Sequence, residues 1–225
     1  MHPMLNIAIR AARAAGDYIV RELDRVSDLS VDTKGKNDFV SEVDKQAERI
    51  IIDTINNSYP DHAFLAEESG QSGESEFVWI IDPLDGTTNF LHGFPHFAVS
   101  IALQYRDVLD QAVVYDPLKN ELFSASKGKG AQLNNKKIHV SSQKKLDSAL
   151  LGTGFPFGEG KELDKFLDTF RRLYPMVAGI RRAGAASLDL AYVACGRLDG
   201  FWEFNLKPWD VAAGALLIQE AGGIN

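Results

Sequence analysis

The feature that most constrains this chain is a run of apolar residues that ends abruptly at two closely spaced aspartates. Residues 79–89 read WIIDPLDGTTN, and the apolar run spans Phe77–Ile81. The run predicts a buried strand, and Pro83 is expected to stop it because proline cannot donate to a strand ladder. Asp82 and Asp85 then lie at the strand end, beside a glycine turn. Carboxylates in this setting can bind hard cations, and N–H groups at a helix start can bind phosphate.

Taken alone, the same motif has a simpler explanation. Asp85-Gly86 is a common turn, and Thr87 or Thr88 is suited to capping a short helix. This structural explanation accounts for the motif as well as metal-assisted attack on a phosphate ester does. The choice therefore depends on whether other carboxylates converge on the same point.

Size and composition set broad limits on function. The 225 residues suffice for one large domain or two small ones, and the net charge of −7 argues against nucleic-acid binding through a basic surface. Cys195 is the only cysteine, so no internal disulfide can form, which suits a reducing cytoplasm. The apolar N-terminal stretch contains Arg10, Arg13 and Asp17, unlike a signal peptide. No uncharged run approaches the roughly 18 residues needed to span a bilayer, so we expect a cytoplasmic protein with no membrane contact.

The hydrophobic periodicity is first helical, then strand-like, and finally an alternation of the two. Residues 4–25 and 43–57 are predicted helices, separated by a loop at roughly 27–40. Strands are expected at 62–66, 77–81, 96–105, 110–116 and 120–126, with hairpin turns at 127–130 and 134–137. Further strands are expected at 148–152, 178–180 and 200–204, alternating with helices at 161–174, 187–195 and 209–221. These patterns predict an N-terminal α+β subdomain at 1–143, which carries most of the acids, and a C-terminal α/β subdomain at 144–225.

Two further acids could converge on the aspartate corner. Glu67 ends one predicted strand as Asp82 ends the next, so pairing of these strands would bring both carboxylates within reach of one cation. Asp210 opens the last predicted helix, where it either caps that helix or reaches the corner from the second subdomain. Like charges about 4 Å apart repel by roughly 4 kcal/mol at an effective dielectric near 20, so such a cluster makes sense with divalent cations. Oxygen ligands without a Cys or His cluster favour Mg²⁺ over zinc.

Three segments, in this order, resemble the inositol monophosphatase family: EES at 67–69, WIIDPLDGTTNF at 79–90 and PWDVAAG at 208–214. The opening MHPMLNIAIRAAR and the segment RRAGAASLDLAY at 181–192 look like the bacterial SuhB-type branch. The resemblance covers essentially the whole chain. It implies an α+β fold, the five-layered αβαβα sandwich of sugar phosphatases, with Mg²⁺ dependence, lithium inhibition and a homodimer. Family members normally continue for some tens of residues beyond the EAGG at 220–223, so we expect a truncated C-terminal part.

The resemblance also assigns metal ligands and catalytic residues. The first metal site falls on Glu67, Asp82 and the backbone carbonyl of Leu84. The second falls on Asp82, Asp85 and Asp210. Activation of the attacking water is assigned to Glu67 together with the pair Asp44 and Thr87.

Substrate contacts follow in the same way. The N–H groups of Gly86 and Thr87 would hold phosphate oxygens. The inositol ring and its hydroxyls would contact Asp85, Gly184, Ala186 and Glu203. Either Lys34 or Lys36 matches a loop lysine near the active site. The implied activity is Mg²⁺-dependent hydrolysis of inositol monophosphate, a small-molecule phosphate monoester, to inositol and phosphate.

Two other functions are open at this point. A related phosphatase with the same metal corner would act on fructose 1,6-bisphosphate or 3′-phosphoadenosine 5′-phosphate. The SuhB-type branch is also associated with antitermination of ribosomal RNA transcription, together with RNA polymerase and Nus factors. In that case Arg181 and Arg182 are candidates for a partner surface, although a dimer surface or a solvated charge pair is the favoured explanation for them.

Overall fold

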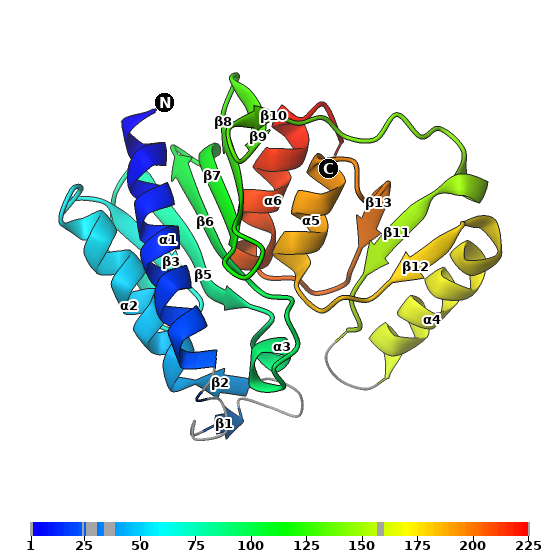
Figure 1. Cartoon of the computed structure of the whole chain (residues 1–225), viewed down its shortest axis with the longest axis horizontal. Helices are drawn as coiled ribbons and strands as arrows, with labels where there is room; N and C mark the ends of the chain where they lie inside the picture. Colours follow the sequence, from blue (N-terminus) through cyan, green and yellow to red (C-terminus); the bar gives the residue numbers. More distant parts are fainter. Residues whose placement is uncertain (1, 24, 26–30, 34–38, 157–159, 225) are drawn as a thin grey trace.

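An eight-stranded sheet is the largest element of the computed structural model, which describes residues 2–23, 25, 31–33, 39–156 and 160–224 (Figure 1). The strand order is β10-β9-β8-β7-β6-β5-β3-β4, and neighbouring strands are antiparallel except β3 and β5, which run parallel. The strands are β3 (Ala63–Ala66), β4 (Gly70–Ser72), β5 (Phe77–Asp85), β6 (Ala98–Tyr105), β7 (Val108–Asp116), β8 (Glu121–Ser126), β9 (Gly130–Leu133) and β10 (Lys136–Lys137).

Helices cover both faces of this sheet. Helices α1 (Pro3–Leu23) and α2 (Glu42–Asn56) lie on one face, and α5 (Ala186–Ala194) and α6 (Pro208–Glu220) lie on the other (Figure 1). Alternate residues of β5 enter the two resulting cores: Trp79 and Ile81 pack with α1 and α2, whereas Ile80 packs with α5 and α6. A strand buried on both faces needs a continuous apolar run, which explains the sequence at residues 77–81.

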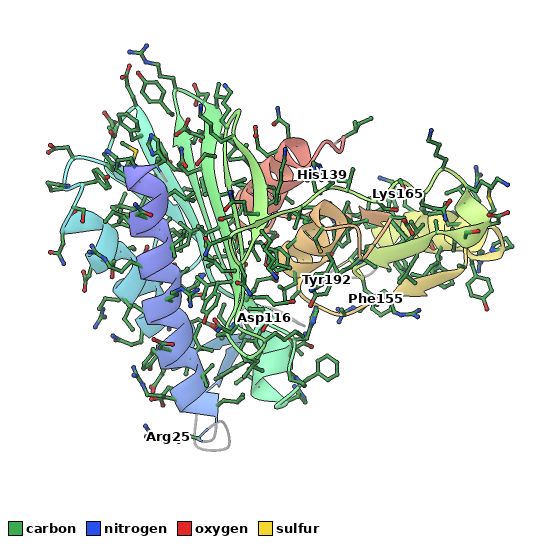
Figure 2. The ribbon with its side chains drawn as sticks, turned by 45° about the horizontal axis from the view of Figure 1, so that its top comes forward. Arg25, Asp116, His139, Phe155, Lys165 and Tyr192 are labelled. Carbon is green, nitrogen blue, oxygen red and sulfur yellow. The ribbon has the colours of Figure 1, made fainter. Side chains whose placement is uncertain are left out.

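A second, smaller sheet lies beyond α5. Its three parallel strands are in the order β12-β11-β13, with bounds Gly179–Arg181, Leu150–Thr153 and Gly200–Trp202. Helix α4 (Lys161–Leu173) packs on this sheet through Phe166, whose ring stacks 6.2 Å from that of Trp202. Figure 2 shows Phe155 and Lys165 on this side of the molecule, away from α1. From left to right, Figure 1 shows α1 and α2, the large sheet, α6 and α5, the small sheet and α4, so the α+β class is confirmed.

The prediction that Pro83 ends the strand is wrong, because β5 continues to Asp85. Its ladder with β6 pairs Asp82 with Ser100 and then Asp85 with Ala98, so the register shifts between the two aspartates. Pro83 lies in this irregular stretch, where the strand does not need a ladder N–H from it. The bulge keeps both carboxylates on one strand while turning the chain toward the next element, α3 (Thr87–Leu91).

Five short strands also differ from the sequence prediction, which gave only hairpin turns at 127–130 and 134–137 in the region of β9 and β10. The described parts of the predicted loop at 27–40 contain β1 (Val31–Thr33) and its antiparallel partner β2 (Phe39–Ser41). Strand β4 was not predicted, because its sequence GQS has no hydrophobic alternation. The other predicted helices and strands are present with bounds shifted by a few residues.

The predicted subdomain boundary at 143/144 lies between β10 and the short 3₁₀ helix at Leu146–Ser148. The division into subdomains 1–143 and 144–225 stays a prediction. Among the helices that the structure describes, none combines the length and the apolar character needed to cross a bilayer.

Candidate functional site

The candidate site begins at the turn between β5 and α3. Gly86 has φ +95°, and a Cβ there would lie 3.0 Å from the His96 carbonyl oxygen, so only glycine fits without strain. The turn is closed by short hydrogen bonds. Leu84 N–H donates to Asp82 Oδ1 at 3.1 Å, and Thr87 Oγ1 donates to the Leu84 carbonyl oxygen at 3.0 Å. These contacts place Asp82, Leu84 and Thr87 in one compact corner.

Parallel pairing of β3 with β5 brings Glu67 beside this corner. Ala66 is paired with Ile81, and the Glu67 N–H donates to the Ile81 carbonyl oxygen at 3.1 Å. Glu67 and Asp82 are therefore the next residues on two neighbouring strands. The predicted adjacency of these two strand ends is confirmed.

Helix α5 meets the corner from the other side of the large sheet. Asp85 Oδ2 accepts hydrogen bonds from Ser187 N–H at 2.7 Å and from Ser187 Oγ at 2.5 Å. Asn89 Nδ2 donates to the Ala183 carbonyl oxygen at 3.0 Å, and a Cβ on Gly86 would lie 3.3 Å from the Gly184 carbonyl oxygen. Residues 183–187 are thus fastened onto the end of β5.

Asp210 lies in the first turn of α6 and accepts a hydrogen bond from Lys207 N–H at 2.6 Å. It therefore takes part in capping the helix. Its charge also raises the pKa values of Glu67, Asp82 and Asp85, so the same side chain lies near the corner. The two roles that the sequence left open for Asp210 are compatible.

Burial and mutual repulsion raise the pKa values of the acids at the corner. The pKa of Glu67 rises to about 8, first through burial and then through the charge of Asp44. Burial, followed by the charges of Glu67 and Asp85, raises the pKa of Asp82 well above its usual range. For Asp85 burial outweighs the hydrogen bonds from Ser187, and its pKa is about 7.

Two more acids lie on the α5 side of the site. Burial and the charge of Asp85 raise the pKa of Glu203 to about 7 and that of Asp189 to about 8. Arg182 partly opposes both shifts. Glu203, predicted as a substrate contact, is therefore within electrostatic reach of the acids at the end of β5.

The carboxylates do not form a finished metal cage. Within the ranges described above, no group of three or more His, Cys, Asp and Glu side chains stands ready to hold a metal ion. Asp82, Asp85 and Asp210 instead direct an oxygen toward N–H groups of the protein. The donor set nevertheless suits a hard cation, because it consists of oxygen atoms and because added positive charge would relieve the repulsion.

The predicted site residues from four distant segments are thus brought together: Asp44 from α2, Glu67 after β3, the 82–87 corner and Asp210 from α6. Gly184, Ala186 and Glu203 lie on the side formed by α5 and β13. Lys34 and Lys36 lie outside the described residues.

Sequence reasoning missed Ser187, Asn89 and Asp189. Ser187 had a detectable signal, since a serine at the start of a predicted helix commonly bonds to nearby polar groups. Asn89 lay within the corner motif but had no assigned role. Asp189 had no signal, because its position among apolar residues on a helix does not reveal that it is only 2% exposed.

Known proteins resemble this chain over nearly its whole length. The model of the inositol monophosphatase family matches residues 1–225. A Nus factor SuhB from Pseudomonas aeruginosa is 57% identical, over 100% of this chain and 85% of that protein. The crystal structure of extragenic suppressor protein suhB from Bartonella henselae has a TM-score of 0.95 at 45% identity, covering 98% of this chain and 86% of that one. An inositol monophosphatase from Anabaena (Nostoc) sp. PCC 7120 has a TM-score of 0.83 at 41% identity, covering 97% and 81%.

Proposed function

Because this chain belongs to the inositol monophosphatase family, we propose that it is a Mg²⁺-dependent phosphomonoesterase that hydrolyses inositol monophosphate to inositol and phosphate. The observation that carries the proposal is the convergence of Glu67, Asp82, Asp85 and Asp210 on the glycine turn at the end of β5. Buried acids that repel one another are unfavourable for folding alone, and they are expected where a cation and a phosphate are to be bound.

Two groups of ligands are available for Mg²⁺. Glu67, Asp82 and the Leu84 carbonyl would hold one ion, and Asp82, Asp85 and Asp210 would hold a second. When bound, such ions supply positive charge that lowers the pKa of the attacking water and stabilises the leaving oxygen. Asp82 belongs to both groups, which agrees with its place at the centre of the corner.

The residues of the chain then bind and orient the reactants. The N–H groups of Gly86 and Thr87 are proposed to donate to phosphate oxygens, which stabilises charge as it develops there. The Thr87 hydroxyl, together with Asp44, would orient the attacking water. Its oxygen would accept a hydrogen bond from this water and so align it for in-line attack. In this role the Thr87 hydroxyl can still donate to the Leu84 carbonyl.

The inositol ring would lie between the corner and the side of the site formed by α5 and β13. Asp85, Gly184, Ala186 and Glu203 are the proposed contacts for its hydroxyl groups. Gly184 has φ +90° and packs against Asn89, so its backbone can approach a ligand closely. Glu203 and residues 184–186 are also proposed to separate the possible substrates, since fructose 1,6-bisphosphate and 3′-phosphoadenosine 5′-phosphate carry a second phosphate.

A panel of phosphate esters tests the proposal directly. We expect release of phosphate from inositol monophosphate with the highest kcat/KM, strict dependence on Mg²⁺ and inhibition by Li⁺. A higher kcat/KM on either bisphosphate would change the substrate assignment, and no phosphate release from any ester with Mg²⁺ present would refute the activity. Sedimentation of the same preparation tests the expected homodimer.

A second candidate function is participation in a transcription antitermination complex with RNA polymerase and Nus factors. The observation in its favour is that relatives as much as 57% identical are named Nus factor SuhB. Arg182, which is stacked 5.0 Å over the ring of half-exposed Phe155, is an accessible candidate contact. A catalytically inactive variant that still supports ribosomal RNA transcription in cells would separate the two functions, and both can coexist in one protein.

A further inference from the structure

The turn that follows Glu67 is held by a buried carboxylate to which the proposed mechanism gives no role. Glu48 lies on α2 and is only 3% exposed. Its Oε2 accepts a hydrogen bond from Glu68 N–H at 2.8 Å, and its Oε1 accepts one from Ser69 N–H at 2.9 Å. Both carboxylate oxygens are therefore bonded to consecutive N–H groups of the turn that begins at Glu67.

The backbone of Glu67 is consequently held on both sides. Its own N–H is bonded to the Ile81 carbonyl of β5, and the next two N–H groups are bonded to Glu48. Beyond them the chain reverses at Gly70, where φ is +76°, and enters β4. The direction in which the Glu67 side chain leaves the backbone thus depends on both β5 and α2.

Packing alone does not hold this turn. A cavity of about 320 Å³ borders it on the α2 side, lined by Lys45, Glu48, Arg49, Ile52, Glu68 and Ser69. Since packing on this side is incomplete, the hydrogen bonds to Glu48 help to hold the turn against α2. Hydrogen bonds from N–H groups to a carboxylate are stronger than neutral ones, especially when the carboxylate is buried.

Helix α2 also carries Asp44, one turn before Glu48 on the same face. One helix therefore supplies an acid to the candidate site and a second acid to the turn that carries Glu67. We propose that Glu48 is a positioning residue that aims the Glu67 carboxylate at the Mg²⁺ site by fixing the backbone of residues 67–69. The inference rests on the proposed function, since it concerns the same site. Partners one layer outside the ligands of a metal commonly change its affinity 10–100-fold when they are removed.

The test is Mg²⁺ binding to the metal-free full-length protein, measured by calorimetry, for the wild type and for Glu48→Gln. The amide keeps the size of the side chain but presents an NH₂ group to one of the two N–H donors. We expect Mg²⁺ affinity to fall by about tenfold or more and kcat to fall at sub-saturating Mg²⁺. Hydrogen exchange at Glu68 and Ser69 should become faster. Asp53→Asn, an exposed substitution on the same helix, is the matched control and should change none of these quantities.

A purely structural role would lower the folded fraction without changing the Mg²⁺ dependence of the molecules that remain folded. If Glu48→Gln does not fold, Glu48→Asp serves instead, because its carboxylate is one methylene too short to reach both N–H groups in their present positions. An affinity within about twofold of the Asp53→Asn control in the folded variant overturns the proposal. That outcome leaves the proposed function intact, whereas a wild type that binds no Mg²⁺ refutes the proposed function itself.

Discussion

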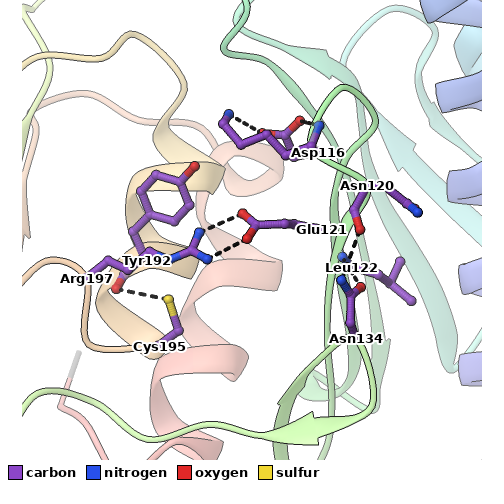
Figure 3. Close-up of polar contacts among 9 residues, drawn as sticks. Asp116, Asn120, Glu121, Leu122, Asn134, Tyr192, Cys195 and Arg197 are labelled. Atoms are coloured by element: carbon purple, nitrogen blue, oxygen red, sulfur yellow. Dashed lines mark hydrogen bonds and ion pairs between the residues drawn. The ribbon is translucent and has the colours of Figure 1, made fainter.

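Carboxylates in two regions of the molecule have opposite electrostatic environments. Glu121 at the start of β8 makes two hydrogen bonds with Arg197, 2.6 and 2.5 Å long, and this guanidinium lies 4.9 Å from the ring centre of Tyr192 (Figure 3). The bonds from Arg197 lower the pKa of Glu121. Glu67, by contrast, is largely buried, and burial together with the charges of Asp44, Glu68, Asp210 and Asp85 raises its pKa to about 8.

The difference separates an acid that is neutralised within the fold from acids that we propose bind a ligand. The charge of Glu121 is compensated inside the chain, and the resulting pair fastens the segment after α5 to the edge of β8. The acids around Glu67 raise one another's pKa values, so an added cation stabilises them much more than it would stabilise Glu121. Four experiments test this difference between the two regions.

The largest effect is expected for Asp85→Asn, which removes one proposed metal ligand. We expect kcat/KM to fall by about a thousandfold, or about 4 kcal/mol, while the metal-free protein keeps or gains thermal stability because a repelling charge is gone. Steady-state kinetics and melting curves with and without Mg²⁺ measure both quantities. Glu121→Gln is the matched control, since it also removes one carboxylate charge but should retain activity. Activity of Asp85→Asn near that of the wild type would exclude Asp85 from the site.

The next effect concerns pH and metal removal. The folded pKa values of Asp85 and Glu67 are raised to about 7 and 8, whereas unfolded carboxyl groups titrate near about 4. Between these values the folded metal-free protein holds more protons than the unfolded chain, so its stability falls as the pH rises from about 5 to 8. The expected loss is on the order of several kcal/mol, and saturating Mg²⁺ should reverse it.

Chemical denaturation of the metal-free protein at pH 5 and pH 8 measures this slope. Asp85→Asn provides the comparison, because loss of one of the coupled acids should flatten the dependence. Metal-free stability that stays constant or increases across this range would contradict the assignment of raised pKa values to the site.

A smaller effect is expected for Ser187→Ala. Both hydrogen bonds from Ser187 reach the same oxygen of Asp85, and the substitution removes only the one from the hydroxyl. We expect a drop in kcat/KM of about tenfold, since Asp85 remains present but is less well oriented. The control is Ser148→Ala, which removes an exposed hydroxyl that is distant in sequence from the site. An unchanged kcat/KM for Ser187→Ala would show that the hydroxyl does not orient Asp85.

The smallest effect is expected for Arg197→Lys at the compensated acid. Lysine keeps the positive charge but cannot make the paired hydrogen bonds to Glu121 or stack as well on Tyr192. We expect a loss of about 1 kcal/mol in the free energy of unfolding, with Mg²⁺ affinity and kcat unchanged. Denaturant titration and calorimetry provide these values. A marked loss of Mg²⁺ affinity in Arg197→Lys would mean that the two regions are coupled and that the contrast drawn between them is wrong.

Much of the site could be predicted from the sequence because several of its residues are close along the chain. Asp82, Asp85 and Gly86 lie within five residues. Glu67 directly follows β3, the strand that pairs with β5. The error at Pro83 arose from a rule about regular ladders, which does not apply where β5 and β6 shift register. Asp189 was missed for a related reason, since nothing in its local pattern indicates that α5 turns it toward the acids of β5.

From the sequence alone, the family, the order of the longer helices and strands, and the acids of the corner could be predicted, because periodicity and short motifs depend on neighbouring residues. Three contacts are visible only in the tertiary structure. Ser187 bonds to Asp85, the charge of Asp210 raises the pKa of Asp82, and Glu48 bonds to the turn after Glu67. These contacts join segments separated by about 20 to more than 100 residues. Which distant residues meet depends on how the helices pack on the two faces of the large sheet. The local sequence pattern does not specify these pairs of residues.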